Sequence, residues 1–443
     1  MYCTAQIIIS LCSTLWGCME KHIIKQILLE QKEEITRLFN SEVISREAVP
    51  MARAKEILNT DLIKAIMGIR RCGKSTLSHQ LLKDKNYGYI NFDDERFISA
   101  ESKDLNDFLE TLEELNPDLK YILLDEIQNV KGWELFVNRL RRKGYNVIVT
   151  GSNSKLLSKE LATHLTGRHL SVELFPFSFR EFLRFKDISV SKNDLYITKK
   201  KAELKRVLEE YIQTGGMPEL FKVETKKDYL RGLFDKIISQ DIIFRYKIKY
   251  VKALREIALY AVSNFSSRFT YHKIKNIFEI KSVHTIKNYL NYLEETYLIF
   301  QLNPFSFKIK EQINQPRKFY CVDTGFINSL VPKTTFDYGK LIENLVFIEL
   351  LRQGKEVYFY SQPNYEVDFL IKEGLEIKKL IQVCFSITDE NTKKREVKSL
   401  LKASDRLKCD DLVVVTWDTY AEELVQSKKI KFIPLWQWLF NKM

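Results

Sequence analysis

The chain has 443 residues, of which 45% are hydrophobic and 29% are charged, with only 15 glycines and 9 prolines. This composition excludes wholesale disorder, and the length is sufficient for two to four domains with a sizeable buried core. The net charge of +12 is compatible with nucleic acid or another polyanion. It is not diagnostic, because many lysine-rich proteins bind none.

The cysteines predict neither a zinc ribbon nor a disulfide framework, because no pair has CxxC spacing and the total of 7 is odd. They are Cys3, Cys12, Cys18, Cys72, Cys321, Cys384 and Cys409. A reducing, cytoplasmic location fits this pattern best.

The first eighteen residues differ from the rest of the chain. Residues 7–16 are apolar and resemble the core of a signal peptide, but no Lys or Arg precedes them and they are too short to span a bilayer as a helix. We expect residues 1–18 to be a non-native extension before Met19, with a membrane anchor as the alternative. Residues 19–58 are expected to be helical, and no other transmembrane segment is visible.

The segment Gly68-Ile-Arg-Arg-Cys-Gly-Lys-Ser fits the phosphate-binding P-loop pattern GxxxxGK[ST] at every fixed position. An apolar run at 62–67 predicts a buried strand before it, and residues 75–82 predict a helix after it. In that context backbone N–H groups surround phosphate oxygens, Lys74 reaches the β- and γ-phosphates, and the Ser75 hydroxyl ligates Mg²⁺. The expected nucleotide-binding residues are Gly68, Ile69, Arg70, Arg71, Cys72, Gly73, Lys74, Ser75 and Thr76. The alternative is a chance glycine turn with a surface lysine.

Residues 121–126 form an apolar strand ending in two carboxylates, which is the Walker B arrangement. Asp125 is expected to hold Mg²⁺, and Glu126 is placed to polarise the attacking water as the catalytic base. The alternative is that both acids cap the next helix, predicted over 133–142.

A third strand is predicted over 146–151 and is followed by Ser152 and Asn153. NTPases with a glutamate beside the Walker B aspartate usually insert a strand between the P-loop strand and the Walker B strand. We therefore expect Ser152 or Asn153 to sense the γ-phosphate or orient the water. A solvated strand-to-helix turn is the alternative.

Strands alternate with helices from about residue 59 to 185, which predicts a parallel sheet with the ligand at the carboxyl ends of its strands. The acidic loop at 93–96 lies at such an end, either near the nucleotide or as a charged surface loop. Arg168 is a candidate arginine finger, acting in cis or from a neighbouring subunit, or it forms a structural salt bridge. The finger reading would require a homo-oligomer. The side chains of Arg70 and Arg71 face either phosphate or solvent.

Residues 186–250 are helical and lysine-rich, with a turn at 214–218, and look like the lid that follows many AAA cores. Residues 251–320 predict three helices and a β-hairpin in the order of a winged helix. His284, Lys287 and Asn288 are the candidates for contacting DNA in the groove. Protein docking or a purely structural role are the alternatives.

The order of elements in residues 321–443 resembles the PD-(D/E)xK nuclease fold, with Glu343 on a helix and Asp368 on a strand. Active members carry an acid and a lysine on the partner strand. Here Gln382 and Cys384 stand at those positions, and neither can replace the expected group. We therefore expect an inactive domain, although Glu376 and Lys378 could form a shifted site.

The blocks GIRRCGKSTL, NFDDERF, YILLDEIQNVKGWE, VIVTGSNSKLLSKELATHLTGRHLSVELFPFSFREF and YIQTGGMPE carry a family resemblance. They resemble an archaeal and bacterial group of AAA-type ATPases that join a P-loop core to a C-terminal restriction-endonuclease-like domain. The resemblance runs from about Glu47 to near Lys398. It implies binding and hydrolysis of ATP.

The leading hypothesis is a Mg²⁺-dependent ATPase whose α/β P-loop core acts on a winged-helix and nuclease-like module. The alternatives are a nucleotide-gated DNA-binding regulator and an ATP-dependent nuclease. The expected partners are ATP, DNA through the winged helix, and a second copy of the chain, with no membrane.

Overall fold

A computed structural model describes residues 19–40, 46, 48–153, 168–191, 193–332 and 337–440. The expected extension at 1–18 lies outside these residues. The chain divides into two compact units. The first contains residues up to 67 together with 73–173, and the second contains residues 68–72 together with those from 174 onward.

The first unit is an alternation of helices and strands around one sheet. Its elements are α2 (Lys21–Asn40), α3 (Ala48–Leu58), β1 (Ile63–Met67), α4 (Lys74–Leu82), β2 (Tyr87–Asn91), η1 (Glu95–Phe97), α5 (Leu105–Leu115), β3 (Tyr121–Asp125), η2 (Ile127–Asn129), α6 (Trp133–Arg142), β4 (Asn146–Gly151) and β5 (His169–Glu173). The five strands are all parallel, in the order β2-β3-β4-β1-β5. The predicted parallel sheet is therefore confirmed.

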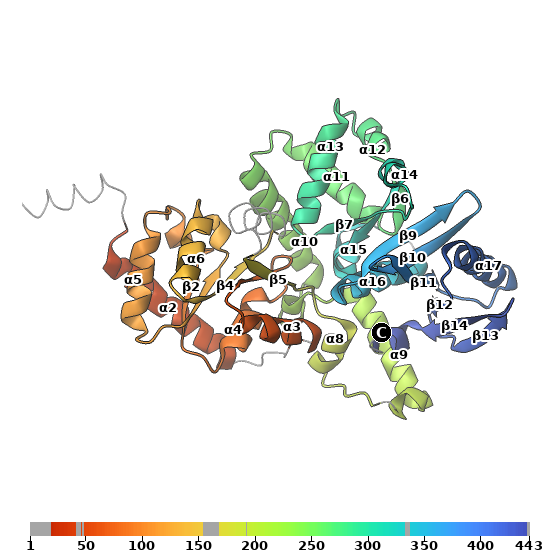
Figure 1. Ribbon diagram of the computed structural model, residues 1–443, viewed down its shortest axis with the longest axis horizontal. Helices are drawn as coiled ribbons and strands as arrows, with labels where there is room; N and C mark the ends of the chain where they lie inside the picture. The colour runs from red at the N-terminus through yellow and green to blue at the C-terminus, as the bar shows by residue number, and fades with distance from the viewer. Residues whose placement is uncertain are drawn as a thin grey trace, which may run out of the picture. The chain divides into compact units, whose positions relative to one another are not determined.

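The central strands of this sheet are apolar because both of their faces are covered. Every residue of β1 is buried, and in β3 and β4 only the first residue is not. Helix α2 packs on α5 and β2, as Figure 1 shows, and α3 covers β5 through Ala54, Ile57 and Val172. Strand β4 lies between β1 and β3, which confirms the inserted strand predicted from the sequence.

The second unit begins with helices. They are α8 (Phe179–Phe185), η3 (Asn193–Tyr196), α9 (Thr198–Thr214), η4 (Pro218–Lys222), α10 (Lys226–Lys236) and the π-helical segment η5 (Ile237–Phe244). Ser178 and Glu181 form a capping box at the start of α8, where each side chain accepts a hydrogen bond from the other residue's backbone N–H. The turn predicted at 214–218 separates α9 from η4.

A three-stranded antiparallel sheet with four helices follows. The elements are α11 (Val251–Ser263), β6 (Ser267–Phe269), α12 (Tyr271–Ile277), α13 (Val283–Glu295), β7 (Ile299–Leu302), α14 (Ile309–Asn314) and β8 (Arg317–Cys321), with the strands in the order β6-β8-β7. Ser282 caps α13 by accepting from the His284 N–H, as expected. The predicted hairpin is the antiparallel pair β7 and β8.

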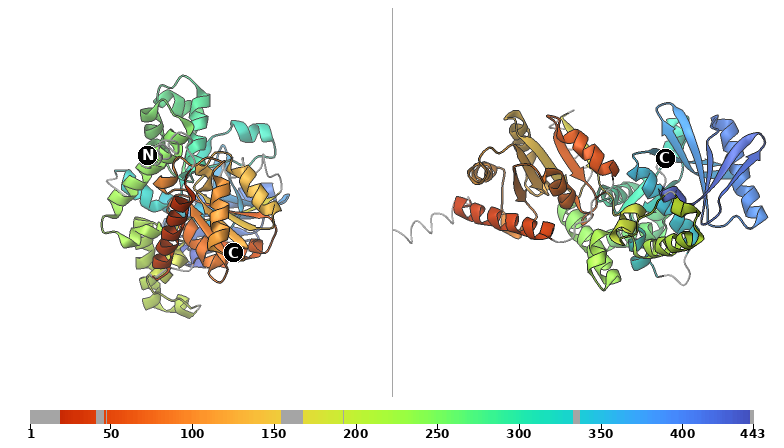
Figure 2. Two further views of the ribbon diagram at one scale, coloured as in Figure 1. Left: turned by 90° about the vertical axis from the view of Figure 1, so that its left-hand side faces the viewer. Right: turned by 90° about the horizontal axis from the view of Figure 1, so that it is seen from below.

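The remainder of the second unit is a six-stranded mixed sheet with its helices. The elements are α15 (Thr324–Leu330), α16 (Tyr338–Arg352), β9 (Glu356–Gln362), β10 (Tyr365–Glu373), β11 (Glu376–Cys384), α17 (Glu390–Leu407), β12 (Leu412–Thr416), β13 (Ala421–Val425), β14 (Lys428–Pro434) and α18 (Leu435–Phe440), with the strands in the order β13-β14-β12-β11-β10-β9. Strands β11, β12 and β14 are parallel, and α17 connects β11 to β12 (Figures 1 and 2).

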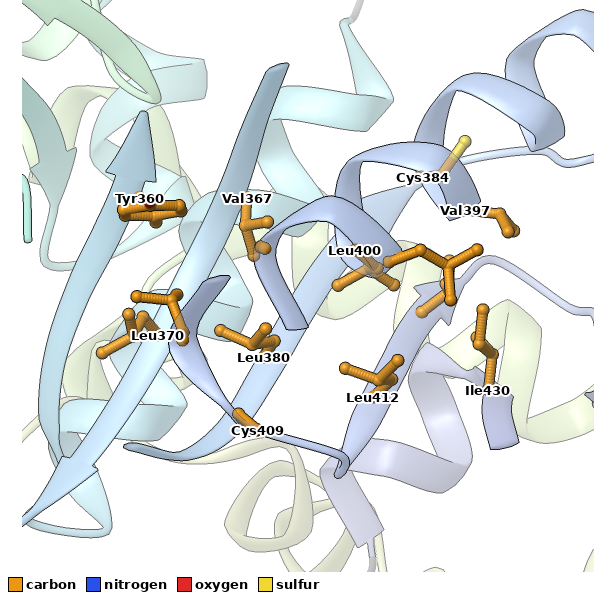
Figure 3. Close-up of a cluster of buried hydrophobic side chains, with 14 of the residues drawn as sticks. Tyr360, Val367, Leu370, Leu380, Cys384, Val397, Leu400, Cys409, Leu412 and Ile430 are labelled. Atoms are coloured by element: carbon orange, nitrogen blue, oxygen red, sulfur yellow. The ribbon is translucent and has the colours of Figure 1, made fainter. Parts of the chain in front are cut away.

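The two faces of this sheet bury different side chains. Figure 3 shows one face, where Leu380, Cys384 and Val367 meet Val397 and Leu400 of α17 in a dry cluster. On the other face Phe347 of α16 stacks on Phe369 of β10, with ring centroids 6.1 Å apart. None of the described helices is long and apolar enough to cross a membrane.

A buried asparagine joins α16 to β8. The Asn344 amide accepts a hydrogen bond from the Cys321 N–H at 2.8 Å and donates one to the Cys321 carbonyl at 2.8 Å. Both backbone groups belong to Cys321, the last residue of β8, so the Asn344 side chain fixes α16 against the end of this strand.

We therefore expect Asn344→Ala to lower the free energy of unfolding by about 2–5 kcal/mol, since it leaves two buried backbone groups unpaired. Urea unfolding of the second unit measures this change. The exposed Asn391→Ala serves as the matched control and should stay within about 0.5 kcal/mol of wild type. A loss no larger than that of the control would contradict the role given to Asn344.

Candidate functional site

The P-loop takes a tight shape between β1 and α4. Arg71 (φ 68°) and Gly73 (φ 95°) both have left-handed backbone conformations, and the Cys72 N–H donates to the Ile69 carbonyl at 3.2 Å. Gly73 is the residue before α4, so its conformation aims the first helical N–H groups into the loop. Gly68 is required for space, because a Cβ there would lie 2.1 Å from the Leu174 carbonyl oxygen.

Side chains of the two motifs meet at the carboxyl ends of β1 and β3. Lys74 Nζ lies 3.4 Å from Glu126 Oε1, and both side chains are largely buried. The Ser75 side chain hydrogen-bonds Asp125, which is also buried. The structure thus brings Lys74, Ser75, Asp125 and Glu126 together, as the two motifs predicted.

Asp125 is held by three neighbouring hydroxyl groups. Besides Ser75, Thr150 of β4 donates to Asp125 Oδ1, and the Tyr89 hydroxyl donates to Oδ2 at 3.3 Å. Burial raises the pKa of the Asp125 carboxyl above its ordinary value, and the adjacent Glu126 carboxylate acts in the same direction. Hydrogen bonds from Ser75 and Thr150 oppose this rise.

The donor set at this point fits Mg²⁺. A serine hydroxyl and a carboxylate supply the hard oxygen ligands that this ion prefers, and nucleotide phosphates and water complete such sites. Burial and the neighbouring Glu126 carboxylate disfavour the charged form of Asp125, and a bound cation would oppose this effect.

Glu126 is positioned by backbone strain and by the tip of β4. Its φ is 50°, an uncommon conformation for a residue with a side chain. Its carboxylate accepts from the Ser152 N–H at 3.2 Å and lies 3.3 Å from the Ser152 hydroxyl. Ser152 and Asn153 are both fully buried, so the solvated-turn alternative is wrong.

The capping alternative for the two acids is also wrong. Glu126 precedes the short helix η2, but its side chain makes no capping hydrogen bond there. Helix α6, at the predicted bounds of 133–142, begins after Gly132 instead.

The side chains of both P-loop arginines form ion pairs with carboxylates. The Arg70 guanidinium is buried and forms two hydrogen bonds of 3.2 Å to the Asp241 carboxylate on η5. Arg71 Nη1 lies 2.8 Å from Glu219 Oε1. The Arg70 side chain therefore faces neither phosphate nor solvent, which corrects the expectation from the sequence.

Arg168 does not join the other site residues in this chain. It directly precedes β5, and Ile63 at the start of β1 pairs with His169, so the exposed Arg168 lies at the amino edge of the sheet. The P-loop follows the opposite end of β1. An arginine finger in cis is not supported by this placement.

The acidic loop at 93–96 is a charged surface loop tied to α2. Asp94 pairs with Arg96 at 2.8 Å and accepts from Gln31 at 3.0 Å, and Arg96 also contacts Glu30. These groups satisfy one another.

Sequence reasoning missed Thr150 and Tyr89, which contact Asp125 directly. Thr150 could have been found, because it is the last residue but one of the strand inserted beside the Walker B strand. Tyr89 had no comparable signal, since its partner depends on how β2 and β3 pair in register.

In the second unit, the predicted acids Glu343 and Asp368 meet at Lys318, but the other predicted nuclease-site residues do not join them. Cys384 belongs to the apolar cluster of Figure 3, and the Gln382 amide donates to Glu396 of α17 at 2.6 Å. Glu376 and Lys378 pair with each other at the exposed tip of the β10–β11 hairpin. Asp368 pairs instead with Lys318, so the shifted site is not assembled.

Comparison with protein families assigns the class. A model described as an AAA domain matches residues 60–183, and two described as domains of unknown function (DUF8612 and DUF4143) match residues 205–337 and 338–438. With the parallel sheet and the loop at 68–75, this defines an AAA-type protein with a P-loop NTPase fold. The nuclease-like part of the resemblance stays a prediction.

The relatives extend over nearly the whole chain. The uncharacterized protein MJ1544 of Methanocaldococcus jannaschii is 36% identical over 437 residues, covering 91% of this chain and 97% of its own. An uncharacterized protein of Haemophilus influenzae is 32% identical over 412 residues, covering 89% and 98%. The chain belongs to the family of these two proteins.

Among solved structures, the Walker-type ATPase PABY2304 of Pyrococcus abyssi is similar to this chain. The identity is 17% and the TM-score is 0.44, over 65% of this chain and 96% of that one.

A histidine supports the site from behind. His79 on α4 is buried, with Nδ1 3.0 Å from the Tyr87 hydroxyl and its ring edge-on to Tyr89 at 4.7 Å. Burial lowers the pKa of its imidazole to about 4. The folded state thus keeps His79 neutral where the unfolded chain protonates it, and stability is lost as the pH falls from about 6.5 toward 4.

When the pH is lowered from about 7 to about 5, we expect the free energy of unfolding to fall by about 2 kcal/mol more in wild type than in His79→Gln. Urea unfolding at both pH values measures the difference. The exposed His272→Gln should behave like wild type. An equal loss in wild type and His79→Gln would show that His79 is not the acid-sensitive group.

Proposed function

We propose that the protein binds ATP with Mg²⁺ and hydrolyses the γ-phosphate. The observation that supports this is the meeting of Lys74, Ser75, Asp125 and Glu126 at one edge of the parallel sheet. Ligands of α/β sheets bind at this edge, at the carboxyl ends of the strands. ATP rather than GTP follows from the family resemblance.

Each group has a distinct task in this proposal. The backbone N–H groups of residues 68–76 and the N-terminus of α4 bind the phosphate oxygens. Lys74 contacts the β- and γ-phosphates, and Ser75 with Asp125 would hold Mg²⁺, which neutralises charge on the phosphates.

Glu126 is the general base of the proposed reaction. It would accept the proton of the attacking water, with Ser152 fixing its carboxylate and Asn153 beside it. Lys74 Nζ lies 3.4 Å from Glu126 Oε1 and pairs with this carboxylate. A bound triphosphate offers Lys74 a stronger partner, so nucleotide binding releases the carboxylate to act on water.

Arg168 enters this proposal only in trans. It is exposed at the amino edge of the sheet, where a second copy of the chain could receive it. A homo-oligomer in which Arg168 stabilises a neighbour's transition state is the form of the proposal consistent with this placement.

The second unit would respond to nucleotide state through two modules. The order α11-β6-α12-α13-β7-α14-β8, with sheet order β6-β8-β7, supports the proposal of a winged helix with one short helix between its last two strands. The order α16-β9-β10-β11-α17-β12 supports the proposal of a restriction-endonuclease-like core. With Gln382 and Cys384 at the positions of the catalytic acid and lysine, cleavage is not proposed.

A nucleotide-gated DNA-binding regulator is the second candidate function. The observation that favours it is the outer face of α13, where His284 and Lys287 are exposed and Asn288 hydrogen-bonds His284 at 3.2 Å. This helix corresponds to the one that enters the major groove in winged-helix proteins.

Lys74→Ala should weaken Mg-ATP binding by about tenfold to a hundredfold, because it removes a charge-assisted hydrogen bond to phosphate. Glu126→Gln should keep nucleotide affinity but lower turnover by about a hundredfold or more. Calorimetric titration and release of labelled phosphate measure the two effects, with GTP run in parallel.

Two exposed positions of the same unit provide controls for that experiment. Lys83→Ala, just beyond α4, and Glu114→Gln on α5 should leave both quantities unchanged. Equal turnover in wild type and Glu126→Gln would refute the proposed base. Absence of binding heat in wild type would refute the proposed function altogether.

If α13 binds DNA, Lys287→Ala should lower affinity for duplex DNA and reduce the slope of log affinity against log salt by about one, since one phosphate contact is lost. Fluorescence anisotropy with and without a non-hydrolysable ATP analogue measures this. Lys281→Ala, exposed just before α13, is the nearby comparison. No DNA binding at low salt would remove the second candidate function.

A further inference from the structure

The second unit contains a buried lysine surrounded by three carboxylates. Lys318 of β8 has a side chain only 4% exposed, and its Nζ lies 2.9 Å from Glu343 Oε1, 2.8 Å from Glu366 Oε1 and 3.2 Å from Asp368 Oδ1. We call these four residues the Lys318 cluster. The proposed ATPase makes no use of it.

The carboxylates of the Lys318 cluster are fixed by additional contacts. The Tyr320 hydroxyl donates to Glu343 at 2.7 Å, the Val383 N–H donates to Asp368 at 3.0 Å, and Arg268 pairs with Glu366. Glu343 comes from α16, whereas Glu366 and Asp368 come from β10. Two elements thus direct three acids at one point, and Lys318 Nζ from β8 occupies that point.

The acids of the cluster are paired with cationic side chains, Lys318 at the centre and Arg268 on Glu366. Although burial acts to lower the pKa of the Lys318 ammonium, Glu343 and Asp368 outweigh it, and that pKa lies above its ordinary value. Burial raises the pKa of Glu343 to about 7. Lys318 and Arg268 are therefore the two cations that face these acids, and burial disfavours the charged form of Glu343 among them.

A divalent cation and the Lys318 ammonium exclude each other from this place. An ammonium is a compact charge that donates hydrogen bonds to three oxygen neighbours, and a small metal ion can likewise be surrounded by oxygens. The N–O distances here are 2.8–3.2 Å, whereas metal–oxygen bonds are about 2.0–2.6 Å. Within the described residues no group of three or more His, Cys, Asp or Glu is arranged to hold a metal ion.

We propose that Lys318 is the resident cation of this carboxylate cluster, standing where a divalent metal ion would otherwise bind. The six-stranded sheet is then assembled without metal. Its acids are bound by a side chain from the three-stranded sheet, since β8 belongs to that sheet. Removing Lys318 should turn the cluster into a site for one divalent ion.

The first test counts Mn²⁺ bound by the full chain in the absence of nucleotide. Equilibrium dialysis of wild type and Asp368→Asn should give the same stoichiometry, because the lysine keeps metal out and any ion at Ser75 and Asp125 is present in both. One additional ion in wild type would overturn the proposal.

The second test removes the lysine. In EDTA, Lys318→Ala should unfold at a lower temperature than wild type. In about 1 mM Mn²⁺ it should recover by several degrees and bind one ion more than wild type. Lys372→Ala on β10, which loses a surface pair with Glu356, should respond to Mn²⁺ as wild type does.

The double variant Lys318→Ala/Asp368→Asn should lose this recovery. If Lys318→Ala does not fold in EDTA, Mn²⁺ should restore the fold. A variant that stays unfolded, or that folds and binds no additional ion, would contradict the proposal. No nucleotide enters either test, so failure here leaves the proposed ATPase unaffected.

Discussion

The nucleotide site depends on two neighbouring carboxylates, Asp125 and Glu126, buried at the end of β3 with one lysine in reach. Burying charge is costly unless it is paired, and a single ammonium cannot compensate both acids. The surrounding groups lessen this imbalance, with hydroxyls on Asp125 and the tip of β4 on Glu126. In the proposed function, Mg²⁺ would supply the positive charge that these two acids still lack.

The second unit meets the same difficulty with a different solution. There, three carboxylates converge from α16 and β10, but the compensating charge is a side chain of the protein itself, Lys318. The pair of acids Asp125 and Glu126 is therefore open to exchange with solutes. The Lys318 cluster already contains a cation that is covalently part of the chain. Buried carboxylates are thus paired with Lys74 in the first unit and with Lys318 in the second.

Most of the first unit could be predicted from the sequence because its signals are local. The apolar runs, the P-loop spacing and the acids after β3 each lie within a few residues, and the inserted strand follows from Glu126 beside Asp125. Tyr89 and Lys318 could not be predicted in the same way. Their partners are fixed by strand register and by packing between elements up to 50 residues apart in sequence. The Arg70–Asp241 pair joins residues that are 171 positions apart.

Thr150 illustrates a wider consequence of the order β3-β4-β1. Its hydroxyl accepts a hydrogen bond from the Glu126 N–H and donates one to the Asp125 carboxylate. A single hydroxyl group therefore bonds both a backbone group and a side chain at the end of the adjacent strand. Valine matches threonine in shape but lacks the hydroxyl, whereas serine keeps it. Natural variation at this position should favour serine over valine. We expect free exchange among aliphatic residues at the flanking positions Val147, Ile148 and Val149. One strand would then carry one position selected for hydrogen bonding and three selected only for hydrophobic packing.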